Sequence, residues 1–75
     1  ITIRPPLEAG YARAVQALSS ALRSDLDWEV RAAAAHSLGG ASGSEAAREA
    51  LKAAAAGDTH PDVRAAAEET LSAFP

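Results

Sequence analysis

The feature that most constrains the fold is an internal repeat with a period of 33 residues. The segment DWEVRAAAAHSLGG at residues 27–40 is followed by HPDVRAAAEETLSA at residues 60–73. The same shift pairs other non-alanine positions, namely Leu18 with Leu51, Asp25 with Asp58, Val30 with Val63, Arg31 with Arg64 and Leu38 with Leu71. Periods of about 20 to 50 residues are typical of solenoids, in which each unit packs only on its neighbours. We therefore expect two stacked units, repeat 1 at about residues 7–40 and repeat 2 at about residues 41–75.

Repeat 1 is predicted to contain two helices. Alanine, the strongest helix former, makes up 21 of the 75 residues but buries little area, so we expect a thin core. The first helix should span residues 7–22, and Asp27 is a suitable N-cap for a second helix that ends at Gly39 and Gly40. Apolar positions at helical spacing are expected to face inward, namely Ala14, Val15, Leu18, Ala21 and Leu22 in the first helix and Val30, Ala33, Ala34, Ser37 and Leu38 in the second.

Repeat 2 is predicted to follow the same plan with different helix ends. Ser42 and Glu45 have the spacing of a capping box at the start of its first helix. GDTH at residues 57–60 is predicted to form a turn. Pro61 suits the first position of the next helix, because an N–H at that position would have no partner within the helix. The expected inward positions are Ala47, Ala50, Leu51 and Ala54, followed by Val63, Ala66, Ala67, Thr70, Leu71 and Phe74.

Residues 1–6, with the sequence ITIRPP, lie before both units. The pair Pro5 and Pro6 favours an extended path, so we expect a lead-in or linker here and the helical domain at residues 7–75. A short strand that pairs with another segment or a second copy is the alternative. Because the chain begins at Ile1 rather than at methionine, we expect it to be part of a longer protein.

Three segments, SDLDWEVRAAAAHSLGG, GSEAAREALKAAAAGD and GDTHPDVRAAAEETL, resemble HEAT-like repeats of the type first described in phycobilisome lyases. The resemblance covers about residues 11–74 and implies an all-α fold, a short α-solenoid of two helical hairpins with four helices. It also implies that Asp25 with Arg31, and Asp58 with Arg64, form hydrogen bonds that tie neighbouring repeats together. Function does not follow from it, because HEAT-like arrays serve as scaffolds, lyases, a diiron hydroxylase and DNA-repair glycosylases.

Composition narrows the class of function. The net charge is −3 without a basic run, which argues against a nucleic-acid binder. The chain has no cysteine, and with one Trp, one Tyr and one Phe it has few bulky side chains to form a cofactor pocket. Charged residues or glycine interrupt every apolar run, which excludes a membrane span. With no visible signal peptide either, we expect a cytoplasmic protein without a cofactor.

No catalytic or metal-binding motif stands out among the polar residues. His36 and His60 do not occupy equivalent repeat positions and are not part of a metal-ligand motif; Ser37 and Pro61 follow them where a diiron hydroxylase of this fold would have glutamate. We expect His60 in a turn or helix cap and His36 facing solvent. Arg31 and Arg64 can be read as an anion-binding row, but the aspartate six residues before each arginine favours a structural pair.

The residues most suited to contact a partner lie on the second helix of each repeat. This surface is predicted to include Trp28, Glu29, His36, Glu68 and Glu69. Glu68 and Glu69 can form an acidic patch for a basic partner. Trp28 is either an interface anchor or folds over its own turn onto Leu26.

Two hypotheses for function follow. The first is a non-enzymatic interaction or scaffold module that binds another protein or the rest of its parent chain. Because two repeats leave both ends of the array uncovered, we also expect further repeats or self-association through these ends. The alternative is a piece of a HEAT-repeat enzyme such as a bilin lyase or a DNA-repair glycosylase.

Overall fold

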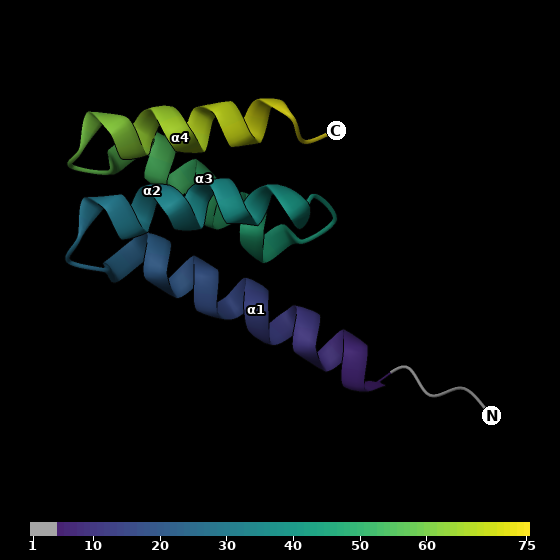
Figure 1. Cartoon of the computed structure of the whole chain (residues 1–75). Coiled ribbons are helices and arrows are strands. Elements are labelled where there is room, and N and C mark those ends of the chain that lie inside the picture. The colour runs from purple at the N-terminus through teal and green to yellow at the C-terminus, as the bar shows by residue number, and fades with distance from the viewer. Residues whose placement is uncertain (1–4) are drawn as a thin grey trace.

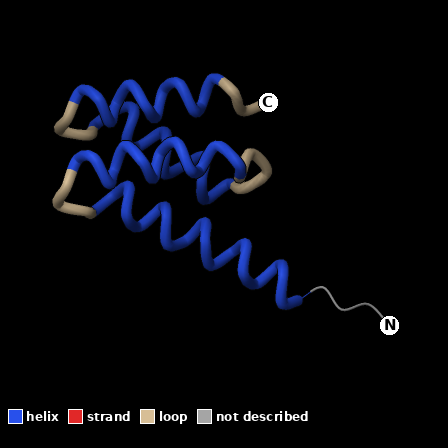
Figure 2. The backbone as a smooth tube through the Cα atoms, in the orientation of Figure 1, coloured by secondary structure: helices blue, strands red, loops and turns tan. Residues whose placement is uncertain are grey.

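The chain forms two helical hairpins stacked side by side (Figure 1). The computed structural model describes residues 5–75, with side chains from Gly10 onward. These residues form α1 (Pro5–Ser24), α2 (Trp28–Ser37), a short 3-10 turn η1 (Leu38–Gly40), α3 (Glu45–Gly57) and α4 (Pro61–Ser72). Figure 2 shows helices joined by short loops and no strand in this range. The predicted all-α solenoid of two hairpins and four helices is confirmed.

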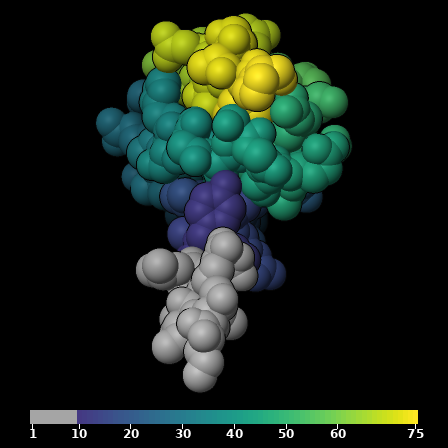
Figure 3. Space-filling view, turned by 90° about the vertical axis from the view of Figure 1, so that its right-hand side faces the viewer, coloured from purple at the N-terminus to yellow at the C-terminus, as the bar shows by residue number. Residues whose placement is uncertain are grey.

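The four helices form two layers. Helix α1 packs on α2 within repeat 1 and on α3 of repeat 2, while α4 packs on α3 and on α2. One layer therefore contains α1 and α3, and the other contains α2 and α4. An end-on view shows the stacking order, with the C-terminal residues above the connection between α2 and α3 and α1 below (Figure 3). Each helix thus has a counterpart one repeat away.

Side chains at the helix starts satisfy backbone donors that have no partner within the helix. Asp27 caps α2 as predicted, accepting from the N–H of Glu29 at 2.9 Å. His60 caps α4, where its Nδ1 accepts from the N–H of Asp62 at 3.0 Å and Pro61 takes the first helical position. The predicted capping box of Ser42 and Glu45 is wrong, because α3 begins at Glu45 and its N-cap is Ser44.

The oxygen Oγ of Ser44 accepts from the N–H of Ala47 at 3.2 Å, so the helix starts two residues later than we predicted. The first helix, α1, begins at Pro5. Pro5 and Pro6, which we placed in an extended lead-in, are therefore in its first turn, where a missing N–H carries no penalty. Residues 1–4 of that lead-in lie outside the described residues.

The core is a thin aliphatic seam between the hairpins. Its largest fully buried side chains are Leu22, Leu38, Leu51 and Val63. The predicted inward positions of α3 are all buried, and in α4 only Leu71 is partly exposed, next to the buried Thr70 and Phe74. The repeat-2 pattern is confirmed.

The inward pattern predicted for repeat 1 holds only in part. Val15, Leu22, Ala34 and Leu38 are buried, but Val30 is 40% exposed, whereas its counterpart Val63 is fully buried. Three further predicted core positions, Ala14, Ala33 and Ser37, are exposed. These positions face the side on which no described helix packs. The predicted helical periodicity is therefore right, but no described helix buries these side chains.

Candidate interaction surface and the contacts between repeats

Arg31 joins the two repeats through its guanidinium group. Its Nε donates to Oδ2 of Asp58 at 2.9 Å, and its Nη2 donates to Oδ1 at 3.1 Å. Its Nη1 donates to the backbone oxygen of Asp25 at 2.8 Å, in its own repeat. The pair is well shielded, since the Arg31 side chain is 12% exposed and that of Asp58 7%. One side chain therefore holds the two turns that precede α2 and α4 in register.

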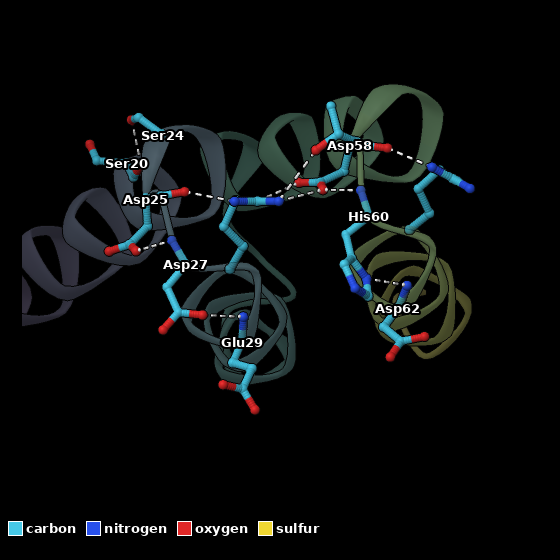
Figure 4. Close-up of polar contacts among 11 residues, drawn as sticks. Ser20, Ser24, Asp25, Asp27, Glu29, Asp58, His60 and Asp62 are labelled. Atoms are coloured by element: carbon cyan, nitrogen blue, oxygen red, sulfur yellow. Dashed lines mark hydrogen bonds and ion pairs between the residues drawn. The ribbon is translucent and has the colours of Figure 1, made fainter.

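The two turns have the same internal construction (Figure 4). Oδ1 of Asp25 accepts from the N–H of Asp27, and Oδ1 of Asp58 accepts from the N–H of His60, both at 2.9 Å. Arg64 donates from Nη1 to the backbone oxygen of Asp58 at 2.7 Å, as Arg31 does to Asp25. Within each repeat the arginine binds the carbonyl of its aspartate, while the carboxylate contact runs between repeats, from Arg31 to Asp58.

The ion pair between Arg31 and Asp58 alters the proton affinity of both groups. Burial acts to raise the pKa of Asp58, but the hydrogen bonds from Arg31 and from the His60 N–H outweigh it, so the pKa lies below its ordinary value. The hydrogen bond to Asp58 raises the pKa of Arg31, against a smaller opposing effect of desolvation. Both groups are charged at neutral pH, and the contact is structural.

Trp28 contacts the neighbouring repeat. Its ring stacks on that of His60 with centroids 4.0 Å apart and an angle of 10° between the planes. Leu26 is 99% exposed, so the predicted fold-back of Trp28 onto Leu26 is wrong. Sequence reasoning did not find this stack, although the repeat alignment puts position 60 just before the counterpart of Trp28. Trp28 remains 36% exposed and forms part of the outer surface.

A second contact across the repeats lies further along α2 and α4. Nδ1 of His36 is 3.8 Å from Oε1 of Glu69, and both side chains are more than half exposed. Glu29 and Asp62 lie seven residues before them, which is two helical turns, and are exposed on the same side. We call this surface the α2–α4 face, and it consists of Trp28, Glu29, His36, His60, Asp62 and Glu69.

Glu68 lies on a different side of α4 from Glu69. Its counterpart in repeat 1 is Ala35, which is fully buried, whereas Glu68 is exposed. It is therefore at the C-terminal end of the stack, away from the α2–α4 face. Four of the five residues predicted for the partner surface come together, and Glu68 does not.

The described residues contain no group of three or more His, Cys, Asp or Glu side chains placed to hold a metal. An open groove of about 570 Å³ runs along α1, and its lining includes Tyr11, Val15 and Ser19. None of the residues that line it in the described part of the chain is acidic or a histidine. Among the helices described, none combines the length and the apolar character that a membrane crossing requires.

The family described as HEAT repeats matches residues 3–72, which is nearly the whole chain. No curated protein and no solved structure matches the chain.

Proposed function

Because this chain belongs to the HEAT-repeat family, a family of helical modules typical of protein interaction and scaffolding, we propose that it is a non-enzymatic module that binds another protein through its α2–α4 face. The observation that carries the proposal is that both repeats build this face jointly. Trp28 stacks on His60 at one end of it and His36 lies beside Glu69 at the other, so residues of both repeats contact each other on this face.

The chemistry of the α2–α4 face favours a partner with basic side chains. Glu29, Asp62 and Glu69 are exposed on it, whereas Arg31 and Arg64 on the same two helices are engaged at the turns. The stacked Trp28 supplies a flat aromatic surface at the edge of this acidic region, and tryptophan is enriched among residues that dominate binding energy. An arginine that stacks on Trp28 while it pairs with a carboxylate would use both features.

Site-specific crosslinking tests the proposal. A photo-crosslinking residue at position 36 reports on the α2–α4 face, and the same residue at position 52, exposed on α3, is the matched control. We expect a defined partner to be captured from position 36, not from position 52, and to be lost when Trp28→Ala and Glu69→Gln are added. Equal capture from both positions, or capture that the two substitutions leave unchanged, contradicts the proposal.

The enzyme alternative stays a prediction. The family match is common to interaction modules and to enzymes with this fold, and the phycobilisome-lyase subtype rests on the resemblance alone. The groove along α1 offers space for a ligand but no acid or imidazole among its described lining residues. Turnover by the isolated domain would favour this alternative.

A further inference from the structure

The two ends of the stack differ in what they expose. Comparing each residue with its counterpart 33 positions away shows which surfaces a neighbouring repeat covers. Positions that are buried in repeat 2 because repeat 1 packs on them are partly or fully exposed in repeat 1. We call the exposed set the N-terminal end face, and it consists of Ala14, Ala17, Leu18, Ala21, Val30, Ala33 and Ser37. All of these side chains except that of Ser37 are apolar.

The opposite end combines charged side chains with the partly exposed apolar residues Ala55 and Leu71. Val15 and Ala35 are buried in repeat 1, where repeat 2 covers them, and their counterparts are Arg48 and Glu68. Arg48 lies over the ring of Phe74, with its guanidinium carbon 5.3 Å from the ring centroid. A charged side chain buried in an apolar seam is strongly unfavourable without a partner, so Glu68 discourages further stacking at this end. The C-terminal end has the polar character of a terminal cap.

Asp25 is the N-terminal counterpart of Asp58, the aspartate that pairs with an arginine of the preceding repeat. It occupies in repeat 1 the place that Asp58 occupies in repeat 2, with the same bond from its carboxylate to the N–H two residues on. In Asp58 the carboxylate also accepts the bidentate contact of Arg31 from the preceding repeat. An arginine from a hairpin stacked on the N-terminal end face would reach Asp25 by the same geometry.

The start of α1 indicates where such a hairpin comes from. A preceding repeat in the same register would end its second helix near residue 4, because the shift of 33 residues places the counterpart of Ser37 there. Residues 5–11 would then form the connection to α1, as residues 38–44 do between α2 and α3. Residues 5–11 instead belong to α1. The connection used between the two repeats therefore has no room at this point, which favours a hairpin from another polypeptide.

We propose that the N-terminal end face docks a helical hairpin of another polypeptide chain, one that carries arginine and alanine at the positions held by Arg31 and Ala35 in α2. The apolar area of Val30 and the four alanines receives the alanine side of that helix, and Asp25 receives its arginine. A second copy of this chain is a poor occupant, because its own end presents Glu68 where alanine is needed. This site is separate from the α2–α4 face and does not depend on the function proposed for it.

The test uses the isotope-labelled wild-type chain as receptor and a variant of the same chain as probe. In the probe, Arg48→Val and Glu68→Ala give the C-terminal end the side chains of Val15 and Ala35, while Arg64 supplies the arginine. A further change, Val30→Glu, blocks the probe's own N-terminal end face and prevents self-association. The matched control probe carries Val30→Glu alone. Circular dichroism checks that each probe folds, and a probe with Glu68→Ala and Val30→Glu replaces the first if Arg48→Val prevents folding.

We expect the amide signals of Ala14, Val30 and Ala33 in the receptor to shift saturably with the probe and not with the control probe. The receptor variant Asp25→Asn should bind at least about tenfold more weakly, since a charge-assisted contact is lost. Absence of these shifts, equal shifts with the control probe, or shifts confined to the α2–α4 face would overturn the proposal. A wild-type dimer formed through Val30 would overturn the role given to Glu68.

Discussion

At the scale of single residues, Asp25 and Asp58 show how one repeated residue can have two different energetic roles. Both cap the turn in which they lie, and both offer their backbone carbonyl to an arginine six residues later. Only Asp58 has its carboxylate in contact with an arginine of the other repeat. The repeat pattern predicts the pair of residue types, but it cannot tell the turn bond from the contact between repeats, because both arginines have an aspartate at the same spacing.

The substitution Asp58→Asn should lower the free energy of unfolding by roughly 1–3 kcal/mol, because it leaves the shielded Arg31 guanidinium without its anion. The matched substitution Asp25→Asn keeps an acceptor for the N–H of Asp27 and should change stability by no more than about 0.5 kcal/mol. Urea denaturation of the two variants measures the difference. Equal losses would show that the contact between repeats adds nothing beyond the turn.

The stability that Asp58 provides should depend on pH in a defined direction. Its pKa is lower in the folded chain than in the unfolded chain, so its contribution is complete above the unfolded value of about 3.9 and is lost as pH falls through the folded value. The difference in unfolding free energy between the wild type and Asp58→Asn should therefore be constant near neutral pH and shrink below about pH 4. A difference that grows on acidification would contradict this assignment.

At the scale of helices, the signals that succeeded are those decided by local chemistry. Asp27 before an apolar run and Pro61 after a turn mark the starts of α2 and α4, and both predictions hold. The start of α3 was misplaced because Ser42 and Ser44 are both suitable caps, and the spacing to Glu45 favoured the wrong one. Exposure of Val30 was missed for another reason: the periodicity of a helix shows which side is apolar but not whether another helix covers it.

Replacing the cap of α3 tests the corrected boundary. Ser44→Ala removes the acceptor for the N–H of Ala47 and should lower the free energy of unfolding by about 1 kcal/mol, with a fall in Tm of roughly 4–8 °C. Ser42→Ala, two residues earlier, is the control and should leave Tm nearly unchanged. Thermal unfolding followed by circular dichroism distinguishes the two positions. A larger effect at Ser42 would restore the capping box predicted from the sequence.

At the scale of the whole molecule, stability depends on one seam between two hairpins rather than on a deep core. Alanine on both sides allows the helices to approach closely, and Leu22, Leu51 and Val63 fill the seam. Neither hairpin has enough apolar area to offset the loss of chain entropy alone. The repeat predicts this architecture well, but the polarity of the stack needs the structure, since the burial of Ala35 and the exposure of Glu68 at equivalent positions depend on which side is covered.

Two exchanges at equivalent positions test this polarity. Ala35→Glu places a carboxylate in the fully buried seam and should lower the free energy of unfolding by about 3 kcal/mol or more, because burial in the seam removes the charge from water. Glu68→Ala changes an exposed side chain at the end of the stack and should alter the stability of the monomer by no more than about 0.5 kcal/mol. Chemical denaturation at low protein concentration gives both values. Similar losses at the two positions would mean that positions 35 and 68 are equally covered in solution. The difference in burial between Val30 and Val63 argues against this outcome. The assignment of the C-terminal end as a polar cap would then fail.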